Sequence, residues 1–392
     1  MPDTKKGPWT LQQVRDQILK DCWSYSAVDP GVGTSGSLWV RGVNGSGQLG
    51  LSDTISRSLP VQIPGNWLSD CRAFCSSEGV SGAIDSSYRL YMWGANPSGQ
   101  LGLSDTVNRS SPVQIPGTIW CSLVLPEWTL SNNTGIHALK TDNTLWGWGQ
   151  NSYGGIGNNV SQGTVAAYSS PVQIPGTTWV CIRRSQHSLA LKSDYSMWTW
   201  GRNYDGQLGI LLRGPFNNRS SPVQLPGSWC EIATGWPISL AIKTDGTMWG
   251  WGGNHYSGIA GLNDVIDRSS PIQIPGTWSK VFSNSTGYTT RSGAIKTTDS
   301  CLYMWGVNSS GQLGLNDSIT RSSPVVLPGS WSCIFGGGVT TVGKRTDNTI
   351  WAWGANNYGQ YNVDKVAYSS PIQVPGSWVT ATGVGSTLFY VC

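Results

Sequence analysis

The sequence predicts an all-β protein, a seven-bladed β-propeller of four-stranded antiparallel blades. The main observation is an internal repeat of about fifty residues, because a period of that length indicates one supersecondary unit copied along the chain. The composition agrees: 51 of the 392 residues are glycine and 12% are charged, which is typical of a chain rich in tight turns. Sheet units that are arranged radially form a propeller. An aromatic-rich strand closes on a glycine in each copy, at Gly42, Gly94, Gly149, Gly201, Gly252, Gly306 and Gly354.

Each repeat contains four strand-like segments, named A to D here in chain order. In the repeat that begins at residue 228, strand A is SWCEIAT, strand B is LAIKT, strand C is TMWGWG and strand D is PIQIPG. Asp245-Gly246 is a two-residue hairpin signal between B and C. A Pro-Gly step closes every strand D and leads into the next strand A. Because the strands alternate in direction, the A–B and C–D loops leave one face of the propeller, and the B–C and D–A turns leave the other.

We assign a structural role, rather than ligand binding, to the repeated tryptophans and arginines. Pairs such as Trp146 and Trp148 lie two residues apart, so both side chains point to one face of strand C, where they fill the space between blades. We expect the arginines that precede the Ser-x-Pro or Ser-Ser-Pro step to brace the C–D loop. They are Arg57, Arg109, Arg219, Arg268 and Arg321.

The two ends of the repeat region are complementary halves. The first copy begins at strand C (residues 37–42), and the last stops after strand B (residues 387–392). We predict one composite blade, with strands A and B from the C-terminus and strands C and D from the N-terminus, because this closure removes an open sheet edge. The predicted domains are a helical leader over residues 1–34 and the propeller over residues 35–392.

Several blocks share the pattern W-G-x-N-x-x-G-Q-L-G, with A-L/I-K-T-D upstream. The clearest are residues 92–106, 200–209 and 304–318; the third copy (GGIG, 154–157) and the seventh (GQYN, 359–362) depart from it. The pattern resembles the repeats of the regulator of chromosome condensation family, over about nine tenths of the chain. The resemblance implies a seven-bladed propeller.

Function does not follow from this fold, because the family includes a chromatin-bound nucleotide-exchange factor, a plant ultraviolet receptor and a secreted enzyme inhibitor. The basic tail and the acidic-loop surface of the exchange factor are not recognisable in this sequence. Of the receptor's Gly-Trp-Arg-His-Thr stretch, only Gly235-Trp236 matches. The Ser/Asn-rich copies, such as NRSSPVQIPG at 108–117, and the short leader look more like those of bacteriophage structural proteins.

The A–B/C–D face carries nearly all the sequence variation, and binding residues usually lie on such loops. Aromatic side chains beside Asn and Ser suit a glycan or a protein partner. The alternative is that each aromatic side chain covers its own blade. The candidates on this face are Trp128, Tyr153, Tyr204, Phe216, Trp236, His255, Tyr256 and Tyr288.

The leader is a candidate anchor. Thr10 and Gln13 form a capping box, and apolar residues then recur at steps of three and four, which predicts an amphipathic helix over about 10–22. A helix this short needs a docking surface, either its own propeller or a larger assembly. The anchor candidates are Trp9, Leu11, Val14, Ile18, Cys22 and Trp23.

Other kinds of site lack support in the sequence. The three histidines fall in different blades, and Cys71 and Cys75 lack a matching second pair, so we expect no metal and no cofactor. The nine cysteines are assigned mainly to buried positions. No nucleophile–base–acid set is recognisable, so we expect no catalytic residues. Without a Lys/Arg run or an apolar span of about 20 residues, neither nucleic-acid binding nor membrane insertion is expected.

The sequence alone favours a non-enzymatic virion structural protein of a bacteriophage, as a tail fibre or another appendage. In this interpretation it is made in the host cytoplasm, because it has no signal peptide. The leader attaches it to other virion proteins, and the A–B/C–D face meets a host glycan, a host protein or a neighbouring subunit. Two alternatives remain: a soluble protein-binding propeller that regulates or inhibits an enzyme or GTPase, and a lectin-like glycan-binding module.

Overall fold

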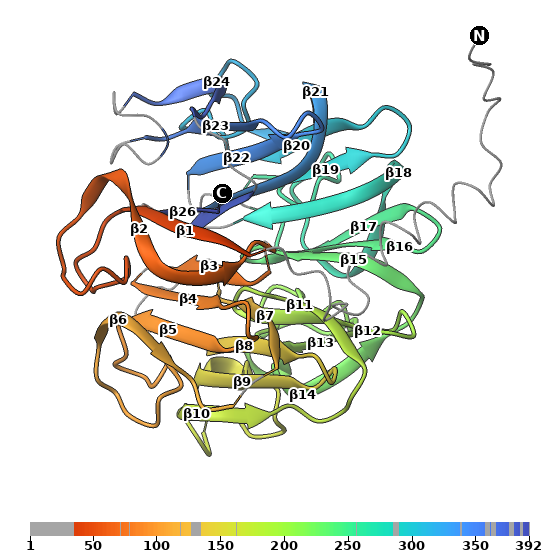
Figure 1. Cartoon of the computed structure of the whole chain (residues 1–392). Helices are drawn as coiled ribbons and strands as arrows, with labels where there is room; N and C mark the ends of the chain where they lie inside the picture. Colours follow the sequence, from red (N-terminus) through yellow and green to blue (C-terminus); the bar gives the residue numbers. More distant parts are fainter. Residues whose placement is uncertain are drawn as a thin grey trace, which may run out of the picture.

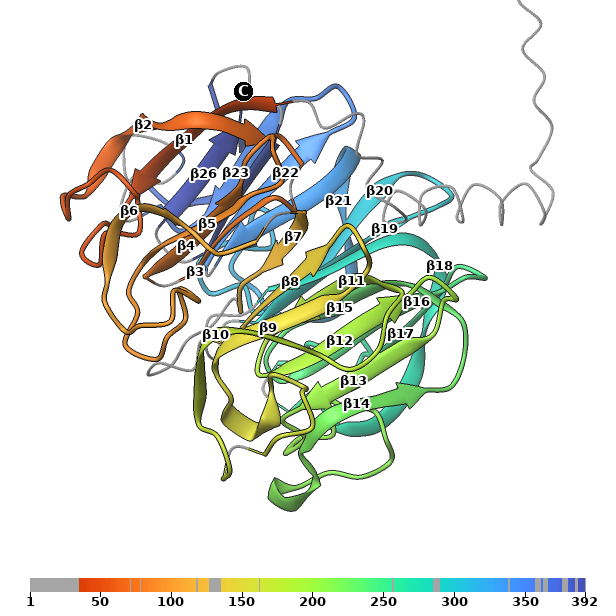
Figure 2. The same cartoon turned by 60° about the horizontal axis from the view of Figure 1, so that its bottom comes forward.

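In the computed structural model, four-stranded antiparallel sheets radiate around a common centre (Figures 1 and 2). Apart from these strands, the regular elements of the described part are two 3-10 turns, η2 (Ser152–Gly154) and η3 (Pro215–Asn217). The predicted leader helix lies outside the described residues. Those residues are 35–70, 72–77, 79–117, 119–126, 135–161, 163–255, 257–284, 290–337, 339–356, 361, 366–375, 380–384 and 387–391.

The predicted composite blade is present. Strand β26 pairs with β1 in antiparallel register, from Thr387 opposite Gly42 to Val391 opposite Leu38. The two ends of the repeat region therefore share one sheet, which closes the ring. In the order A to D, this first blade contains β25 (Thr380–Val384), β26 (Thr387–Val391), β1 (Ser35–Gly42) and β2 (Arg57–Leu68).

Three further blades are separate sheets of consecutive strands. The second contains β3 (Phe74–Ser77), β4 (Val80–Ile84), β5 (Leu90–Gly94) and β6 (Arg109–Gln114). The third contains β7 (Trp120–Val124), β8 (Gly135–Lys140), β9 (Leu145–Gln150) and β10 (Ala167–Gln173). The fourth contains β11 (Trp179–Arg184), β12 (His187–Lys192), β13 (Met197–Gly201) and β14 (Arg219–Leu225).

Blades 5 to 7 are joined into one continuous ten-stranded sheet. The sequence predicts a D–A turn at every Pro-Gly step, but in β2, β18 and β21 the strand runs through that step. Strands β18 and β21 are each strand D of one blade and strand A of the next. The joined sheet contains β15 (Trp229–Thr234), β16 (Ile238–Lys243), β17 (Thr247–Gly252), β18 (Arg268–Asn284), β19 (Arg291–Lys296), β20 (Cys301–Gly306), β21 (Arg321–Gly337), β22 (Thr340–Arg345), β23 (Ile350–Gly354) and β24 (Tyr368–Gln373).

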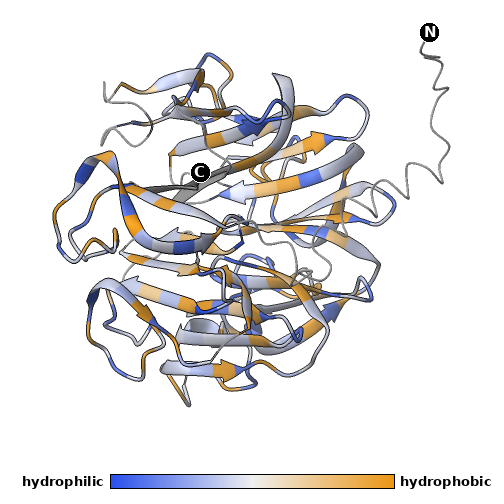
Figure 3. Cartoon of the chain, viewed as in Figure 1, coloured by the Kyte–Doolittle hydropathy of each residue, from blue (hydrophilic) through white to orange (hydrophobic). Residues whose placement is uncertain are grey.

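The hydrophobic core is divided among the spaces between blades, and apolar residues occur along the strands all around the ring (Figure 3). The strand A tryptophan packs edge-on against both tryptophans of the strand C pair. In blade 4, the Trp179 ring lies 6.2 Å from Trp198 and 6.1 Å from Trp200. This confirms the structural assignment of the repeated tryptophans.

The G-Q-L-G motif, or its variant, joins neighbouring blades at six of the interfaces. The indole Nε1 of Trp148 in blade 3 donates to the backbone oxygen of Gln100 in blade 2 at 3.0 Å. Five other tryptophans make the equivalent bond across a blade interface. A Cβ on the motif's last glycine, Gly102, would lie 2.9 Å from the Trp148 Nε1, so only glycine fits there. We call this contact the interblade latch.

The B–C/D–A face is uniform for a physical reason. The Lys140 ammonium lies 4.8 Å from the Trp120 ring and 4.3 Å from the Trp146 ring. Lys192, Lys243 and Lys296 take the same place in blades 4 to 6, as does Arg345 in blade 7. The cation of the K-T-D motif therefore covers the aromatic stack by a cation–π contact.

Cys121, Cys181, Cys301 and Cys333 are free thiols. Burial raises the pKa of the Cys121 thiol to about 12, so this thiol stays protonated at neutral pH. No helix among the described residues is long and apolar enough to span a membrane.

Candidate binding face

The C–D loops are held from below by a buried asparagine in the W-G-x-N motif. In blade 2, Asn96 Nδ2 donates to the backbone oxygen of Asp105 at 3.0 Å, and its Oδ1 accepts the N–H of Leu101 at 2.8 Å. The same bonds recur in blades 1, 5 and 6. A common loop frame therefore presents different side chains on different blades.

An ion pair braces four of these loops. Arg109 Nη2 lies 2.6 Å from Asp105 Oδ2, and equivalent pairs join Arg57 to Asp53, Arg268 to Asp264 and Arg321 to Asp317. The backbone N–H of Val107, with Arg109, holds the pKa of Asp105 below its ordinary value. Arg219 of blade 4 lacks such a pair, because Leu212 stands where the other loops have the aspartate; it donates instead to the backbone oxygen of Asn218.

Three of the predicted aromatic candidates meet around one arginine. The Arg202 guanidinium carbon lies 5.4 Å from the Tyr153 ring, 5.5 Å from the Tyr204 ring and 5.8 Å from the Trp236 ring. These rings come from the C–D loops of blades 3 and 4 and from the A–B corner of blade 5. All three distances fall within the range of cation–π attraction. We call Arg202 with these rings the arginine–aromatic cluster.

Gln186 fixes the geometry of the cluster. Its Oε1 accepts from Arg202 Nη1 at 2.5 Å and from Trp236 Nε1 at 3.1 Å. Arg202 Nη2 lies 3.9 Å from the carboxylate of Asp205, too long for a hydrogen bond. Trp236 is 7% exposed and Tyr204 is 53% exposed. The exposed part of the cluster is therefore the tyrosine edge, whereas the Trp236 indole, also a candidate for the binding face, is nearly buried against Arg202.

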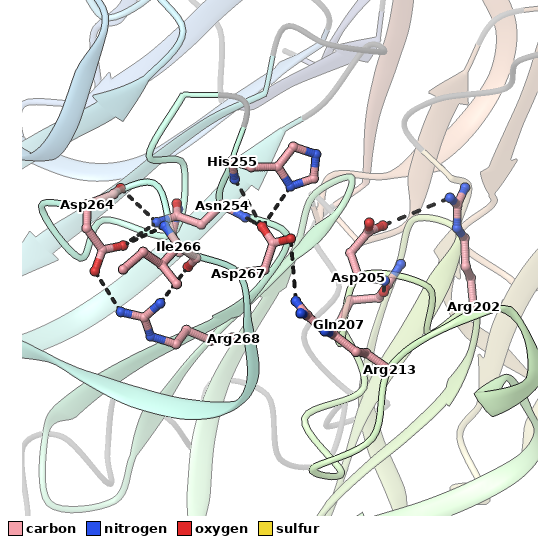
Figure 4. Close-up of polar contacts among 11 residues, drawn as sticks. Arg202, Asp205, Gln207, Arg213, Asn254, His255, Asp264, Ile266, Asp267 and Arg268 are labelled. Carbon is pink, nitrogen blue, oxygen red and sulfur yellow. Dashed lines mark hydrogen bonds and ion pairs between the residues drawn. The ribbon is translucent and has the colours of Figure 1, made fainter.

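A second polar group lies beside the cluster, in the loops of blades 4 and 5 (Figure 4). Asp267 Oδ1 accepts from His255 Nδ1 at 2.7 Å and from the backbone N–H of Asn254 at 2.7 Å, and Arg213 Nη1 lies 3.7 Å from Asp267 Oδ2. Burial raises the pKa of Asp267, but the hydrogen bonds from His255 and Asn254 outweigh it and keep the pKa below its ordinary value.

Asp205 connects the two groups. Burial raises the pKa of its carboxyl, and the negative charge of Asp267 adds to this, while Arg202, His255 and Arg213 act in the opposite direction. Figure 4 shows Asp205 between Arg202 and the Asp267–Arg213 pair. The surface of blades 3 to 5 therefore combines aromatic rings with both signs of charge. The described part of the chain has no group of three His, Cys, Asp or Glu that could hold a metal.

A buried arginine inside the same sector has a packing role. Arg184 is 2% exposed and donates to the backbone oxygen of Gly155 in the neighbouring blade. A Cβ at Gly135 or Gly155 would lie within 2.7 Å of its guanidinium nitrogens. Gly155 takes the place of the G-Q-L-G glutamine in blade 3, so Arg184 occupies the volume that this glutamine would fill.

Sequence reasoning located part of this surface. Tyr153, Tyr204 and Trp236 converge; Phe216 is 95% exposed on η3, and His255 belongs to the second group. Trp128, Tyr256, Tyr288 and the six anchor candidates lie outside the described residues. The arginines and Gln186 were missed. One signal could have found Arg202, because the variable position of W-G-x-N is uncharged in the other six repeats: Val43, Ala95, Gln150, Gly253, Val307 and Ala355.

The fold and the loop surface define a repeat propeller with one variable face. The model of the regulator of chromosome condensation (RCC1) repeat matches residues 89–120, 196–242 and 299–341. The three matched segments include the three blocks with the clearest W-G-x-N-x-x-G-Q-L-G pattern, residues 92–106, 200–209 and 304–318.

Two relatives align with part of this chain. The ultraviolet-B receptor UVR8 of Arabidopsis thaliana is 27% identical over 62% of this chain and 55% of its own length. The human E3 ubiquitin-protein ligase HERC2 is 28% identical over 72% of this chain. The chain spans about half of the receptor's length and 6% of the ligase's, so neither match assigns an activity.

Solved structures show the fold over nearly the whole chain. Human WBSCR16 superposes with a TM-score of 0.74 at 18% identity, covering 91% of this chain and 98% of its own. Prp20p of Saccharomyces cerevisiae, whose structure was described with its binding to Gsp1p and histones, gives a TM-score of 0.74 at 16% identity, with coverage of 94% and 93%. Together with the sheet pattern, these superpositions confirm the all-β propeller predicted from the sequence.

Proposed function

We propose that this chain is a non-enzymatic protein-binding propeller that contacts its partner through the A–B/C–D face of blades 3 to 5. The observation that carries the proposal is the arginine–aromatic cluster, in which Arg202 is surrounded by Tyr153, Tyr204 and Trp236 from three blades. Arginine, tyrosine and tryptophan are the residues that most often dominate protein–protein binding energy, and they do so in compact, well-packed groups.

The cluster is also built to be rigid. Gln186 holds Arg202 and Trp236 together, so little side-chain freedom is left to lose when a partner binds. Protein binding is described for one solved protein of the same fold, Prp20p, and this supports the suitability of the fold for such a role. A regulatory action on an enzyme or a GTPase is the form of protein binding that we propose.

Glycan binding fits the cluster less well. Sugars stack on open aromatic faces, whereas the Trp236 indole is 7% exposed and has the Arg202 guanidinium 5.8 Å from its ring. Tyr204 is more open, at 53%. A single half-open tyrosine offers little area for stacking, while an arginine held among three rings matches a protein hot spot.

The proposal is tested by affinity capture with the full-length chain, followed by titration of the captured protein. Tyr204→Ser and Arg202→Ala should each weaken binding about tenfold or more, because hot-spot residues typically contribute above 1 kcal/mol. Val107→Ser is the matched control, since Val107 is a 59% exposed apolar residue in the uniform loop of blade 2. Equal binding by all three variants would refute the proposed site.

The finer prediction of a bacteriophage virion protein has no support among the relatives described above, which come from a plant, human and yeast. It stays a prediction, together with its leader anchor and its virion location. The same capture experiment tests this prediction with the variant Val14→Asp. If residues 1–34 are the anchor, this variant should no longer capture capsid or tail proteins. If Val14→Asp captures the same proteins as the native chain, the anchor role is wrong.

A further inference from the structure

The C–D loop of blade 4 carries apolar residues where the other loops carry polar ones, and these residues do not help the loop to fold. Six loops share a position with a left-handed backbone, where φ lies between +58° and +67°. Serine or asparagine occupies it in five of them: Ser52, Ser104, Asn159, Asn263 and Asn316. In blade 4 it is Leu211, with a φ of 67° and 76% of its surface exposed. A branched apolar side chain is unfavourable in this backbone conformation. Because the side chain is exposed to water, it adds no hydrophobic stabilisation that would offset this cost.

The next position repeats the departure. Asp53, Asp105, Asp264 and Asp317 follow the left-handed residue in blades 1, 2, 5 and 6, and each pairs with the loop arginine. In blade 4 this residue is Leu212, which is 47% exposed. The loop therefore carries two leucines at positions where the other braced loops have polar residues, and it lacks their ion pair.

The backbone of this loop is nevertheless firmly held. Leu211 N–H donates to the Ser269 oxygen at 2.8 Å, and the Leu212 oxygen accepts from Asn203 Nδ2 at 2.8 Å. Gly214 N–H donates to the oxygens of Asn203 and Tyr204, both at 3.0 Å. These bonds fix the segment that leads into η3, where Phe216 is 95% exposed. Three large apolar side chains are thus held in water in a preformed arrangement.

The charge on this loop indicates the kind of partner surface that it binds. Residues 209–218 contain one charged side chain, Arg213, and no acid. Arg213 is 58% exposed, and its Nη1 lies 3.7 Å from Asp267 Oδ2, beyond hydrogen-bonding distance. Asp267 already accepts from His255 and Asn254. Arg213 can therefore donate to a second carboxylate.

We propose that residues 209–218 form a docking loop, which inserts Leu211 and Phe216 into an apolar pocket of a protein partner while Arg213 pairs with a carboxylate at the edge of that pocket. Residues held in a strained backbone conformation cluster at functional sites, and Leu211 is such a residue. Because the loop is ordered before binding, the partner gains its contact area at a small entropic cost. This inference rests on the proposed function, since Tyr204 of the arginine–aromatic cluster precedes the docking loop by five residues.

The test restores the common loop sequence. The double variant Leu211→Asn with Leu212→Asp should melt at the same temperature as the native chain or higher, because asparagine tolerates the left-handed backbone and both positions are exposed to water. Its affinity for the captured partner should nevertheless fall about tenfold or more. A lower melting temperature would show that the leucines serve folding, and the inference would be withdrawn.

Single variants test the chemistry of the contact. Phe216→Ser should lose about tenfold in affinity, whereas Phe216→Leu keeps most of it because an apolar pocket accepts either side chain. Arg213→Glu should lose binding more than Arg213→Lys does, and reversing the charge of a partner carboxylate should rescue Arg213→Glu. Ile319→Ser is the matched control, at a 62% exposed site in the loop of blade 6.

Photocrosslinking identifies the partner surface that contacts the docking loop, with p-benzoylphenylalanine in place of Phe216 in the full-length chain. Crosslinks that converge on one apolar pocket bordered by Asp or Glu support the docking loop; crosslinks to an acid-free or polar surface overturn it. If Arg202→Ala and Tyr204→Ser lose the partner while the loop variants keep it, the docking loop is wrong and the proposed function stands. If no variant of the face loses a partner, both are wrong.

Discussion

The C–D loops of blades 1, 2 and 6 are nearly copies of one another, whereas those of blades 3, 4 and 5 differ in length, charge and aromatic content. The first group keeps the Asp–Arg brace in every member. The second brings together the arginine–aromatic cluster, the Asp267 group and the docking loop. Both groups share the same interblade latch beneath the loops. The latch builds the ring, and the loops of blades 3 to 5 are free to specialise.

The shared latch predicts the largest effect, and it should be equal in the two regions. Gly102→Ala in blade 2 and Gly209→Ala in blade 4 each place a Cβ within 2.9 Å of the next blade's indole Nε1, at a φ of about +71°. Each should reduce the free energy of unfolding by about 2–4 kcal/mol. Chemical denaturation measures both. A large cost at one glycine and none at the other would contradict a latch common to both regions.

Acid should weaken the variable region through its buried histidines. Burial lowers the pKa of His187 to about 3 and that of His137 well below its ordinary value. The unfolded chain binds a proton near pH 6.5 and the folded chain does not, so stability is full above that pH and is lost as the pH falls toward 3. At pH 5 the burial of His187 costs about 2 kcal/mol of stability.

His187→Gln tests this pH dependence, because an amide can still meet Ser239 Oγ, which lies 2.7 Å from His187 Nε2, but does not titrate. Denaturation of the variant between pH 7 and pH 5 should show a clearly shallower loss of stability than denaturation of the native chain. An unchanged slope would mean that His187 binds protons equally in the folded and the unfolded chain, so that folding does not lower its pKa.

Loss of the cluster arginine should affect binding and leave folding almost intact. Arg202→Ala removes the cation shared by three rings, and we expect about 1.4–2 kcal/mol of lost binding free energy, roughly tenfold or more in affinity. Calorimetric titration and thermal melting of the same samples separate the two effects. A drop of melting temperature as large as that of the latch variants would assign Arg202 to packing instead.

The brace gives the smallest expected effect. Arg109→Ala breaks an ion pair on the surface, whereas Arg219→Ala in blade 4 breaks a bond to a backbone oxygen only. We expect Arg109→Ala to lower the melting temperature by about 1–2 °C and Arg219→Ala by less. The lowered pKa of Asp105 adds a pH test, because the Arg109 effect should fade as the pH falls below about 4. A larger effect at Arg219 would overturn this contrast.

Repetition made the fold predictable, and the lack of repetition limited prediction of the site. Seven copies of a four-strand unit, and two complementary half-copies at the ends, are enough to predict the ring and the pairing of β26 with β1. The convergence of Tyr153, Tyr204 and Trp236 on Arg202 depends on how far loops of three blades extend over the face, which no single repeat encodes. The exposure of each loop residue could not be predicted from the sequence either. Trp236 and Phe216 are both aromatic loop residues, yet they are 7% and 95% exposed.

The measurement that most directly tests a binding face confined to blades 3 to 5 is hydrogen–deuterium exchange of the full-length chain with and without its captured partner. The partner should slow exchange in residues 151–166, 203–218 and 254–267, and leave residues 44–56, 96–108 and 308–320 unchanged. Protection of the second set, or equal protection of both, would contradict the assignment of binding to the variable region.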